Sequence, residues 1–264
     1  MTGPVPRPSG EVIAVPVGDG VVVAEVVGTG PPLLLIHGWT LDRRIWDLQR
    51  PLARHFRIVA VDRRGFGQST APPDLGREPA DIIAVADALG LDRFALGGLS
   101  QGGRVAMRTA LLAPRRVTHV VLLGSALDGL GSDDAEPPIP IAAMRSAACA
   151  GDLDGLRACW RRHPFMAART VRGRRLLDGI LSDYDGRELL SGAGCLPVMA
   201  GDLAALGMPV CALVGVHDTP HRHQVAAAIA QFSPRGSLIK IPRAGHLCNL
   251  DNPRDVAHCF RVLV

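Results

Sequence analysis

Ser100 lies between two glycines in the stretch Gly98-Leu-Ser-Gln-Gly102, which has the G-x-S-x-G pattern of an exposed nucleophile. The apolar run 94–96 before it predicts a buried strand, and the pattern over 104–112 predicts a helix that ends near Pro114. Glycines are needed beside a serine on such a sharp turn, because larger side chains would collide with the strand and the helix. We therefore predict that Ser100 is a nucleophile, beside a helix N-terminus that favours negative charge.

A serine hydroxyl needs a base within hydrogen-bond reach and a third group that orients this base. Ligand-facing residues of an open parallel sheet follow the carboxyl ends of its strands. His246 has this position after the predicted strand 237–241, and Asp218 has it after the predicted strand 209–215. The resulting chain order is Ser, Asp, His.

Asp128 is the alternative orienting acid, because it follows another predicted strand, 117–123. Acyl transfer also requires N–H donors for a developing oxyanion. We expect them to be the backbone amides of Gln101, which follows the nucleophile, and of Trp39, in the loop after the apolar run 33–36.

The elements that must position these residues alternate along the chain. Predicted strands cover 11–17, 21–27, 33–36, 57–61, 94–96, 117–123, 209–215 and 237–241, and predicted helices cover 44–52, 79–89, 104–112, 224–231 and 253–262. This order predicts an α/β fold with a doubly wound, mostly parallel sheet of about eight strands.

The alternation stops between residues 128 and 206, where only short helical patterns occur, at 141–150, 152–163 and 170–183. We expect residues 1–127 and 207–264 to form the core and residues 128–206 to form an inserted helical cap. Residues 1–10 are predicted to be a disordered lead. Leu99, Trp160 and Phe165 are candidates for an apolar substrate pocket, although ordinary packing within the cap is the better explanation for the two aromatic residues.

The composition excludes several classes of protein. The net charge of the 264 residues is +4, but the basic residues are nearly all arginine and form no stripe with aromatic residues of the kind that binds nucleic acid. No run approaches the roughly 20 apolar residues of a membrane span, and no signal peptide is expected. The six cysteines show no C-x-x-C spacing. We expect a cytoplasmic monomer or homodimer with a small-molecule substrate and no nucleic-acid or membrane partner.

Three histidines, His217, His221 and His223, surround the predicted acid Asp218. No set of cysteines or carboxylates accompanies them in a recognisable zinc spacing. We therefore expect no metal site.

Five motifs in order complete a resemblance: His37-Gly-Trp, Asp62-x-Arg-Gly-x-Gly-x-Ser69, Gly98-Leu-Ser-Gln-Gly102, Gly215-x-x-Asp218 and Gly245-His246. Together they resemble the α/β-hydrolase superfamily, from about residue 20 to the C-terminus apart from the cap. The style is similar to small bacterial esterases, non-haem haloperoxidase-like proteins and enol-lactone hydrolases. The resemblance implies a hydrolase that needs no cofactor.

The leading hypothesis is a serine hydrolase that cleaves a carboxylic ester or lactone. The scaffold also hosts carbon–carbon bond hydrolases, lyases and cyclisation steps, and the fold does not decide among them. A ligand-sensing binding protein on the same scaffold is a third hypothesis, since such proteins can keep a whole triad.

Overall fold

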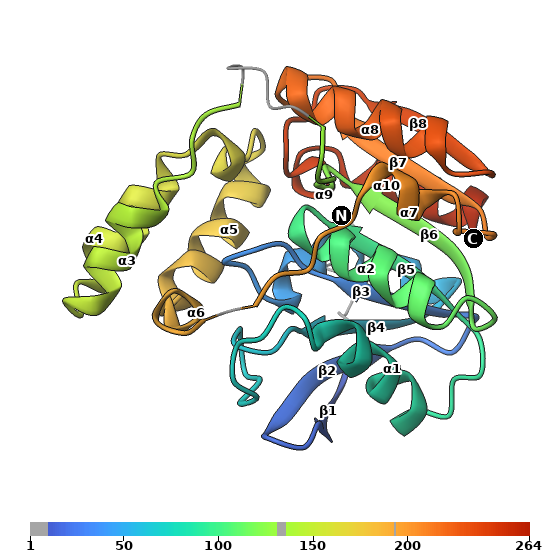
Figure 1. The fold of residues 1–264 in the computed structure, drawn as a ribbon, viewed down its shortest axis with the longest axis horizontal. Helices are drawn as coiled ribbons and strands as arrows, with labels where there is room; N and C mark the ends of the chain where they lie inside the picture. Colours follow the sequence, from blue (N-terminus) through green and yellow to red (C-terminus); the bar gives the residue numbers. More distant parts are fainter. Residues whose placement is uncertain (1–9, 131–135, 193) are drawn as a thin grey trace, which may run out of the picture.

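A computed structural model describes residues 10–130, 136–192 and 194–264. Its centre is one eight-stranded sheet with the order β1-β2-β4-β3-β5-β6-β7-β8 (Figure 1). The strands are β1 (Glu11–Pro16), β2 (Val21–Val27), β3 (Pro32–Ile36), β4 (Arg57–Asp62), β5 (Phe94–Leu99), β6 (Val117–Leu123), β7 (Val210–Gly215) and β8 (Gly236–Ile241). Only β2 runs antiparallel to its neighbours β1 and β4. The predicted doubly wound, mostly parallel sheet is thus confirmed.

Helices cover both faces of this sheet. One face carries α1 (Glu78–Ala88), α2 (Gln101–Leu112), α7 (Ala200–Leu203) and α8 (Pro220–Phe232). The other carries the 3-10 helix η1 (Arg43–Arg54), α9 (Cys248–Asp251) and α10 (Pro253–Leu263). Along the chain, η1 lies on the second face, α1, α2, α7 and α8 lie on the first, and α9 and α10 return to the second.

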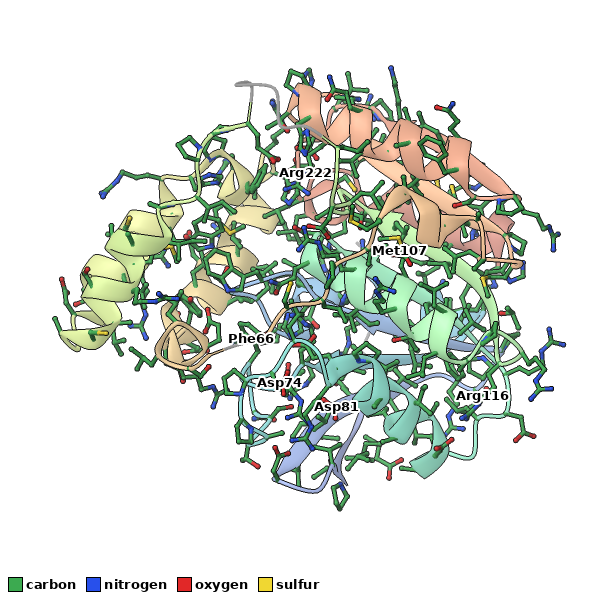
Figure 2. All side chains as sticks on the ribbon, in the orientation of Figure 1. Phe66, Asp74, Asp81, Met107, Arg116 and Arg222 are labelled. Carbon is green, nitrogen blue, oxygen red and sulfur yellow. The ribbon has the colours of Figure 1, made fainter. Side chains whose placement is uncertain are left out.

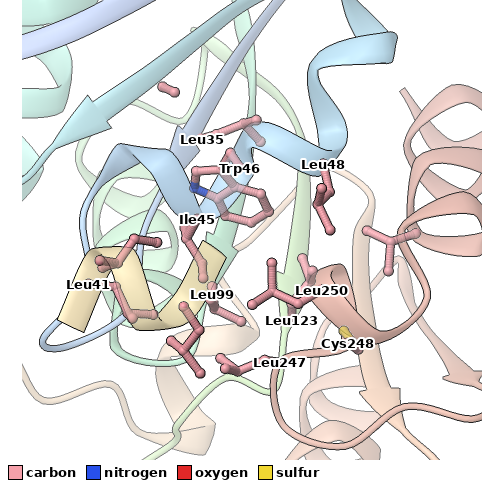
Figure 3. Packing of buried hydrophobic residues seen from close by; sticks show 14 of the residues in the cluster. Leu35, Leu41, Ile45, Trp46, Leu48, Leu99, Leu123, Leu247, Cys248 and Leu250 are labelled. Atoms are coloured by element: carbon pink, nitrogen blue, oxygen red, sulfur yellow. The ribbon is translucent and has the colours of Figure 1, made fainter. Parts of the chain in front are cut away.

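The apolar strand β3 explains why two separate hydrophobic cores form. Its side chains alternate, so that Leu33 and Leu35 enter the core beneath η1, α9 and α10, while Leu34 and Ile36 enter the core beneath α1, α2 and α8. All four are fully buried. Figure 3 shows the first of these cores, in which Leu35 lies near Trp46. A strand buried on both faces requires an unbroken apolar run, which this segment has.

The described residues between β6 and β7 form short helices and a 3-10 turn, most of which lie on one side of the sheet domain, whereas the last helix, α7, packs against the sheet near α8 (Figure 1). They are α3 (Ile141–Cys149), α4 (Leu153–Arg161), η2 (Pro164–Met166), α5 (Val171–Asp183), α6 (Arg187–Leu190) and α7. No strand occurs between β6 and β7 among the described residues, although an isolated bridge joins Asp128 to Met199. The predicted lead over residues 1–10 lies outside the described residues, except for Gly10.

Several boundaries differ from the sequence-based prediction. Helix α8 begins at Pro220 and not at residue 224, because the Thr219 side chain caps it by accepting a hydrogen bond from the backbone N–H of Arg222, and a proline suits the first helical position. Strand β5 extends to Leu99, since glycines continue the ladder with β3 and β6. Among the described residues, no helix combines the length and apolarity that crossing a bilayer requires.

Helix α2 approaches β3 so closely that only glycine fits at position 102. A Cβ atom there would lie 2.4 Å from the backbone oxygen of His37 and 2.5 Å from that of Ile36. Gly98 is similarly restricted, with 2.6 Å to the backbone oxygen of Gly102. The glycines that flank Ser100 are therefore required by backbone packing.

Gly102→Ala is expected to lower the free energy of unfolding by about 1–3 kcal/mol, because the strand and the helix must separate to admit the methyl group. Gly179→Ala is the matched control, since Gly179 is exposed in α5 with no atom within 4 Å of the added Cβ. It should raise the free energy of unfolding by up to about 1 kcal/mol through helix propensity. Urea unfolding of both variants measures the contrast, and equal effects would contradict the packing argument.

Candidate active site

Ser100, His246 and Asp218 form one hydrogen-bonded line at the carboxyl edge of the sheet. The Ser100 hydroxyl lies 3.1 Å from Nε2 of His246, and Nδ1 of the same ring lies 3.1 Å from a carboxylate oxygen of Asp218. In a neutral imidazole with this tautomer, Nδ1–H donates to Asp218 and Nε2 accepts from the serine hydroxyl. The structure thus brings Ser100 together with two residues that follow it by more than a hundred positions in the sequence.

The backbone at Ser100 is strained. Its φ is 52° and its ψ is −118°, in a region that residues with side chains rarely adopt. The strain is held by the neighbouring chain, because the backbone N–H of Ser100 donates to the carbonyl of Leu123 at 2.8 Å. Such a turn directs the hydroxyl away from the sheet and towards the base.

His246 and Asp218 lie on loops that are fixed in the same manner. The backbone N–H of Gly245 donates to the side chain of Asp251 at 2.9 Å, which holds the loop before His246. The backbone N–H of Asp218 donates to Gly215 at 3.0 Å, directly after β7. Side-chain exposure is only 3% for His246 and 1% for Asp218, so water hardly competes for their hydrogen bond.

The electrostatic setting keeps Asp218 ionised. Burial alone would raise the pKa of its carboxyl, but the attraction of His246, the hydrogen bonds from His246 and from the Thr219 amide, and the charge of Arg222 together lower the pKa below its ordinary value. A charged carboxylate beside Nδ1 both fixes the tautomer of the imidazole and stabilises its protonated form.

The alternative acid Asp128 is engaged elsewhere. One of its carboxylate oxygens accepts a hydrogen bond from Arg104 at 2.8 Å, and the other accepts from the backbone N–H of Val198 at 2.9 Å. Asp128 therefore fastens helix α2 to the segment before α7, and it is Asp218 that contacts the imidazole.

The two amides expected to hold an oxyanion border the same cavity. Trp39 and Gln101 both line it, and neither backbone N–H donates a hydrogen bond to any described residue. Unpaired amides beside a cavity are available to a ligand oxygen.

A cavity of about 130 Å³ opens above Ser100 and His246. Trp160 and Phe165, two of the three predicted pocket residues, line it together with Met166 from the same segment. Leu99 does not line it: its side chain is fully buried in the core beneath η1, where Figure 3 shows it beside Leu123. Successive side chains of a strand point to opposite faces of the sheet, and that of Leu99 points into the core beneath η1. Leu99 therefore does not line the cavity, although it precedes the serine in sequence.

A chain of ring contacts runs from the loop after β3, through the segment between β6 and β7, to the imidazole. Successive ring centroids lie 5.1 Å apart for Trp39 and Trp160, 4.7 Å for Trp160 and His163, 4.8 Å for His163 and Phe165, and 4.1 Å for Phe165 and His246. The last pair is stacked at an interplanar angle of 23°. Phe165 thus fixes one face of the His246 ring.

A buried carboxylate holds the far end of this chain. Glu188 accepts a hydrogen bond from the indole N–H of Trp39 at 2.9 Å and another from the hydroxyl of Tyr184 at 2.5 Å, both through Oε1. Its Oε2 is buried without a partner among the described residues. Burial is the main reason why the pKa of Glu188 lies above its ordinary value, although the two hydrogen bonds oppose the shift.

The motif over 62–69 supports the site from below and does not enter the cavity. Buried Arg63 pairs with Glu78 at 2.5 Å and donates to the side chain of Gln101 at 2.7 Å. Its backbone N–H donates to Nε2 of His37, whose Nδ1 lies 2.7 Å from the carbonyl of Gly38. Burial, followed by the charge of Arg63, holds the pKa of His37 well below its ordinary value, so this histidine stays neutral and shapes the loop.

The three histidines around Asp218 do not converge. His221 lies in the first turn of α8, 3.8 Å from Glu136. Within the described ranges, no group of three or more histidine, cysteine or acidic side chains is arranged to hold a metal ion. The six cysteines are free thiols.

Sequence analysis missed three neighbours of the site. Gly124 has a φ of 50°, and a Cβ atom there would lie 3.0 Å from Nδ1 of His246, so only glycine leaves room for the imidazole. Glu188 of α6 contacts Trp39, and Arg222 lines the cavity from the first turn of α8. A glycine directly after a predicted strand could have indicated Gly124 as a position of close packing. Neither Glu188 nor Arg222 belongs to a local sequence pattern that indicates a site.

Comparison with known proteins agrees with this architecture. Residues 33–258 match the Alpha/beta hydrolase family. The chain is 27% identical, over 90% of its length and 98% of the relative's, to a pimeloyl-[acyl-carrier protein] methyl ester esterase of Nitrosomonas europaea. A solved thermophilic esterase from Thermogutta terrifontis superposes with a TM-score of 0.75 at 26% identity, covering 96% of this chain and 97% of that one. A bromoperoxidase from Bacillus anthracis, at 24% identity, shares the fold with a TM-score of 0.80 over 97% and 99%.

The buried carboxyl of Glu188 predicts a pH-dependent stability. Because its pKa is raised in the folded state, ionisation weakens folding, and the contribution present at low pH is lost as pH rises. Between pH 4 and 8, wild type should therefore lose stability relative to Glu188→Gln. Tyr184→Phe should steepen this loss, because it removes a hydrogen bond to the ionised form. Urea unfolding at several pH values measures both slopes, and parallel profiles for all three proteins would contradict the assignment.

Proposed function

Because the chain belongs to the alpha/beta hydrolase family, we propose that it is a serine hydrolase that cleaves a carboxylic ester or a lactone. The observation that carries the proposal is the continuous line from Asp218 through His246 to Ser100, with 3.1 Å at each step, beside a cavity that opens on the serine. The esterase names of the relatives agree with ester chemistry.

The proposed reaction begins when Oγ of Ser100 attacks the carbonyl carbon of the substrate and Nε2 of His246 accepts the hydroxyl proton. Asp218 stabilises the imidazolium that forms. The tetrahedral intermediate then expels the alcohol, which takes the proton from His246, and leaves an acyl group on Ser100. A water molecule attacks this acyl group, gives its proton to His246, and the acid leaves as Ser100 recovers its proton.

The negative charge of each tetrahedral intermediate would be stabilised by the backbone amides of Gln101 and Trp39. Gln101 is the first residue of α2, so the helix dipole adds to its hydrogen bond. Trp39 is held by its indole contact with Glu188, which restrains the loop that carries its amide. Catalysis by these groups requires no cofactor.

We further propose that residues 128–206 act as a cap that limits the substrate. Trp160, Phe165 and Met166 contribute apolar walls to the cavity above Ser100. Its modest volume of about 130 Å³ favours a short acyl or alcohol group in this conformation.

Ser100→Ala is expected to lower kcat for a short p-nitrophenyl ester by about 10⁴-fold or more, because no other group supplies the nucleophile. Initial rates on a panel of short and long p-nitrophenyl esters and lactones measure this loss. The melting temperature of the variant serves as the folding control. Near-normal turnover by a folded Ser100→Ala protein would contradict the nucleophile assignment. Absence of any turnover by wild type, with labelling of Ser100 by a fluorophosphonate, would redirect the proposal to non-ester chemistry.

Asp218→Asn is expected to lower kcat by about 10⁴-fold, because the amide no longer favours the required tautomer of His246. Asp128→Asn is the matched comparison, since it removes a partly exposed ion pair worth about 1 kcal/mol and should cost at most about tenfold. Initial rates under saturating ester distinguish the two acids. Similar losses in both variants would contradict the assignment of Asp218 as the orienting group.

A further inference from the structure

The charged side chains that line the cavity are all basic. Apart from His246, the ionisable side chains among the described residues that line it are Arg104 and Arg222, and no aspartate or glutamate lines it. The other walls are largely apolar, including Trp39 and Phe165. A cavity that serves only neutral esters has no use for two guanidinium groups beside its nucleophile.

Both guanidinium groups are fastened to the short segment that follows β6. Arg104 donates to the carboxylate of Asp128 at 2.8 Å, and Arg222 donates to the carbonyl of Ser125 at 3.0 Å. Ala126, between these two anchors, itself lines the cavity. The two arginines therefore flank one stretch of wall, although they come from different helices, α2 and α8.

Both arginines lie close in sequence to a residue of the Ser100, His246 and Asp218 line. Arg104 lies near the start of α2, four residues after Ser100, and both residues line the cavity. Arg222 lies in the first turn of α8, four residues after Asp218. The positive wall is thus built from the same two helix N-termini that follow the nucleophile and the acid.

The setting of Arg222 makes its charge effective. Its side chain is only 8% exposed, and its guanidinium lies 4.9 Å from the centre of the Phe165 ring. Its counter-ion Glu136 accepts a hydrogen bond from Nε at 2.7 Å but does not line the cavity. Figure 2 shows Arg222 between helix α8 and the segment that carries α3 to α6. A guanidinium shielded from water attracts an anion more strongly than an exposed one.

We propose, on the basis of the proposed function, that the substrate is an ester or lactone that carries a carboxylate a few carbon atoms from the bond that is cleaved. The carboxylate lies against Arg104 and Arg222 while the carbonyl carbon meets Ser100. Guanidinium groups match the planar geometry of a carboxylate and donate paired hydrogen bonds to it. The small volume of the cavity favours short chains, such as monoesters of dicarboxylic acids of four to six carbons.

Pairs of substrates that differ only in charge test this proposal. Monomethyl glutarate is compared with methyl 4-carbamoylbutanoate, in which a neutral amide replaces the carboxylate on the acyl side. 4-Acetoxybutanoate is compared with 4-acetoxybutanamide, which moves the same change to the alcohol side. In at least one pair, kcat/KM should be about tenfold or more higher for the carboxylate, since a charged hydrogen bond contributes more than a neutral one.

Variants assign the preference to the two arginines. Arg104→Gln and Arg222→Gln should each reduce the carboxylate-to-amide ratio by about tenfold, mainly through KM. Arg222→Lys keeps the charge at the buried position and should retain part of the ratio. Arg108→Gln is the matched control: Arg108 lies one turn further along α2, binds the carbonyl of Pro197 and the side chain of Asp202, and does not line the cavity. The carboxylate-to-amide ratio of kcat/KM for Arg108→Gln should equal that of wild type.

Wild type that hydrolyses the neutral partner of both pairs equally well would overturn the substrate class and leave the serine-hydrolase proposal intact. If no ester is hydrolysed, the proposed function fails. The preference for a carboxylate is then tested by binding measurements alone. Calorimetric titration of Ser100→Ala with each carboxylate and amide should then show tighter binding of the carboxylate in at least one pair. The double variant Ser100→Ala/Arg104→Gln should bind the carboxylate and the amide of that pair equally. Equal affinities within both pairs would overturn the inference.

Discussion

The close approach of α2 to the end of β3 is the constraint on which the site depends. With only hydrogen atoms at positions 98 and 102, the chain turns within a few residues from strand to helix, and Ser100 takes a backbone conformation that side chains rarely adopt. The same turn places Gln101, the first residue of α2, in the wall of the cavity. The proposed nucleophile and the proposed oxyanion donor therefore share one backbone geometry, and the buried sheet stabilises both.

The predictable part of this molecule is the part encoded by local patterns. The apolar run of β3 indicates a strand buried on both faces, and the glycines around Ser100 indicate a tight turn. Since ligand-facing residues follow the carboxyl ends of parallel strands, Asp218 and His246 can then be identified as candidates. The choice between Asp218 and Asp128 was open in the sequence, because both follow strands of the same sheet. What separates them is a side-chain contact across the fold, since Arg104 engages Asp128.

The insertion between β6 and β7 contributes more to the site than apolar walls. Rings from Trp160 to Phe165 connect Trp39, which carries one of the proposed oxyanion amides, with the face of His246. A displacement of this segment would therefore disturb both ends of the site together. Sequence analysis could name Trp160 and Phe165 as candidates, but not their stacking order, because that order depends on how α4 and η2 pack against the sheet.

The role of the many arginines in this chain depends on where each side chain lies. Arg63 and Arg64 are buried in ion pairs with Glu78 and Asp81, where each charge is compensated and the loop that carries them is fixed. These pairs organise the backbone, and their charge is not available to a ligand. Arg104 and Arg222 are also paired, with Asp128 and Glu136, but both arginines line the cavity and their counter-ions do not. The overall charge of +4 therefore carries less information about function than the position of two arginines in the wall of one cavity.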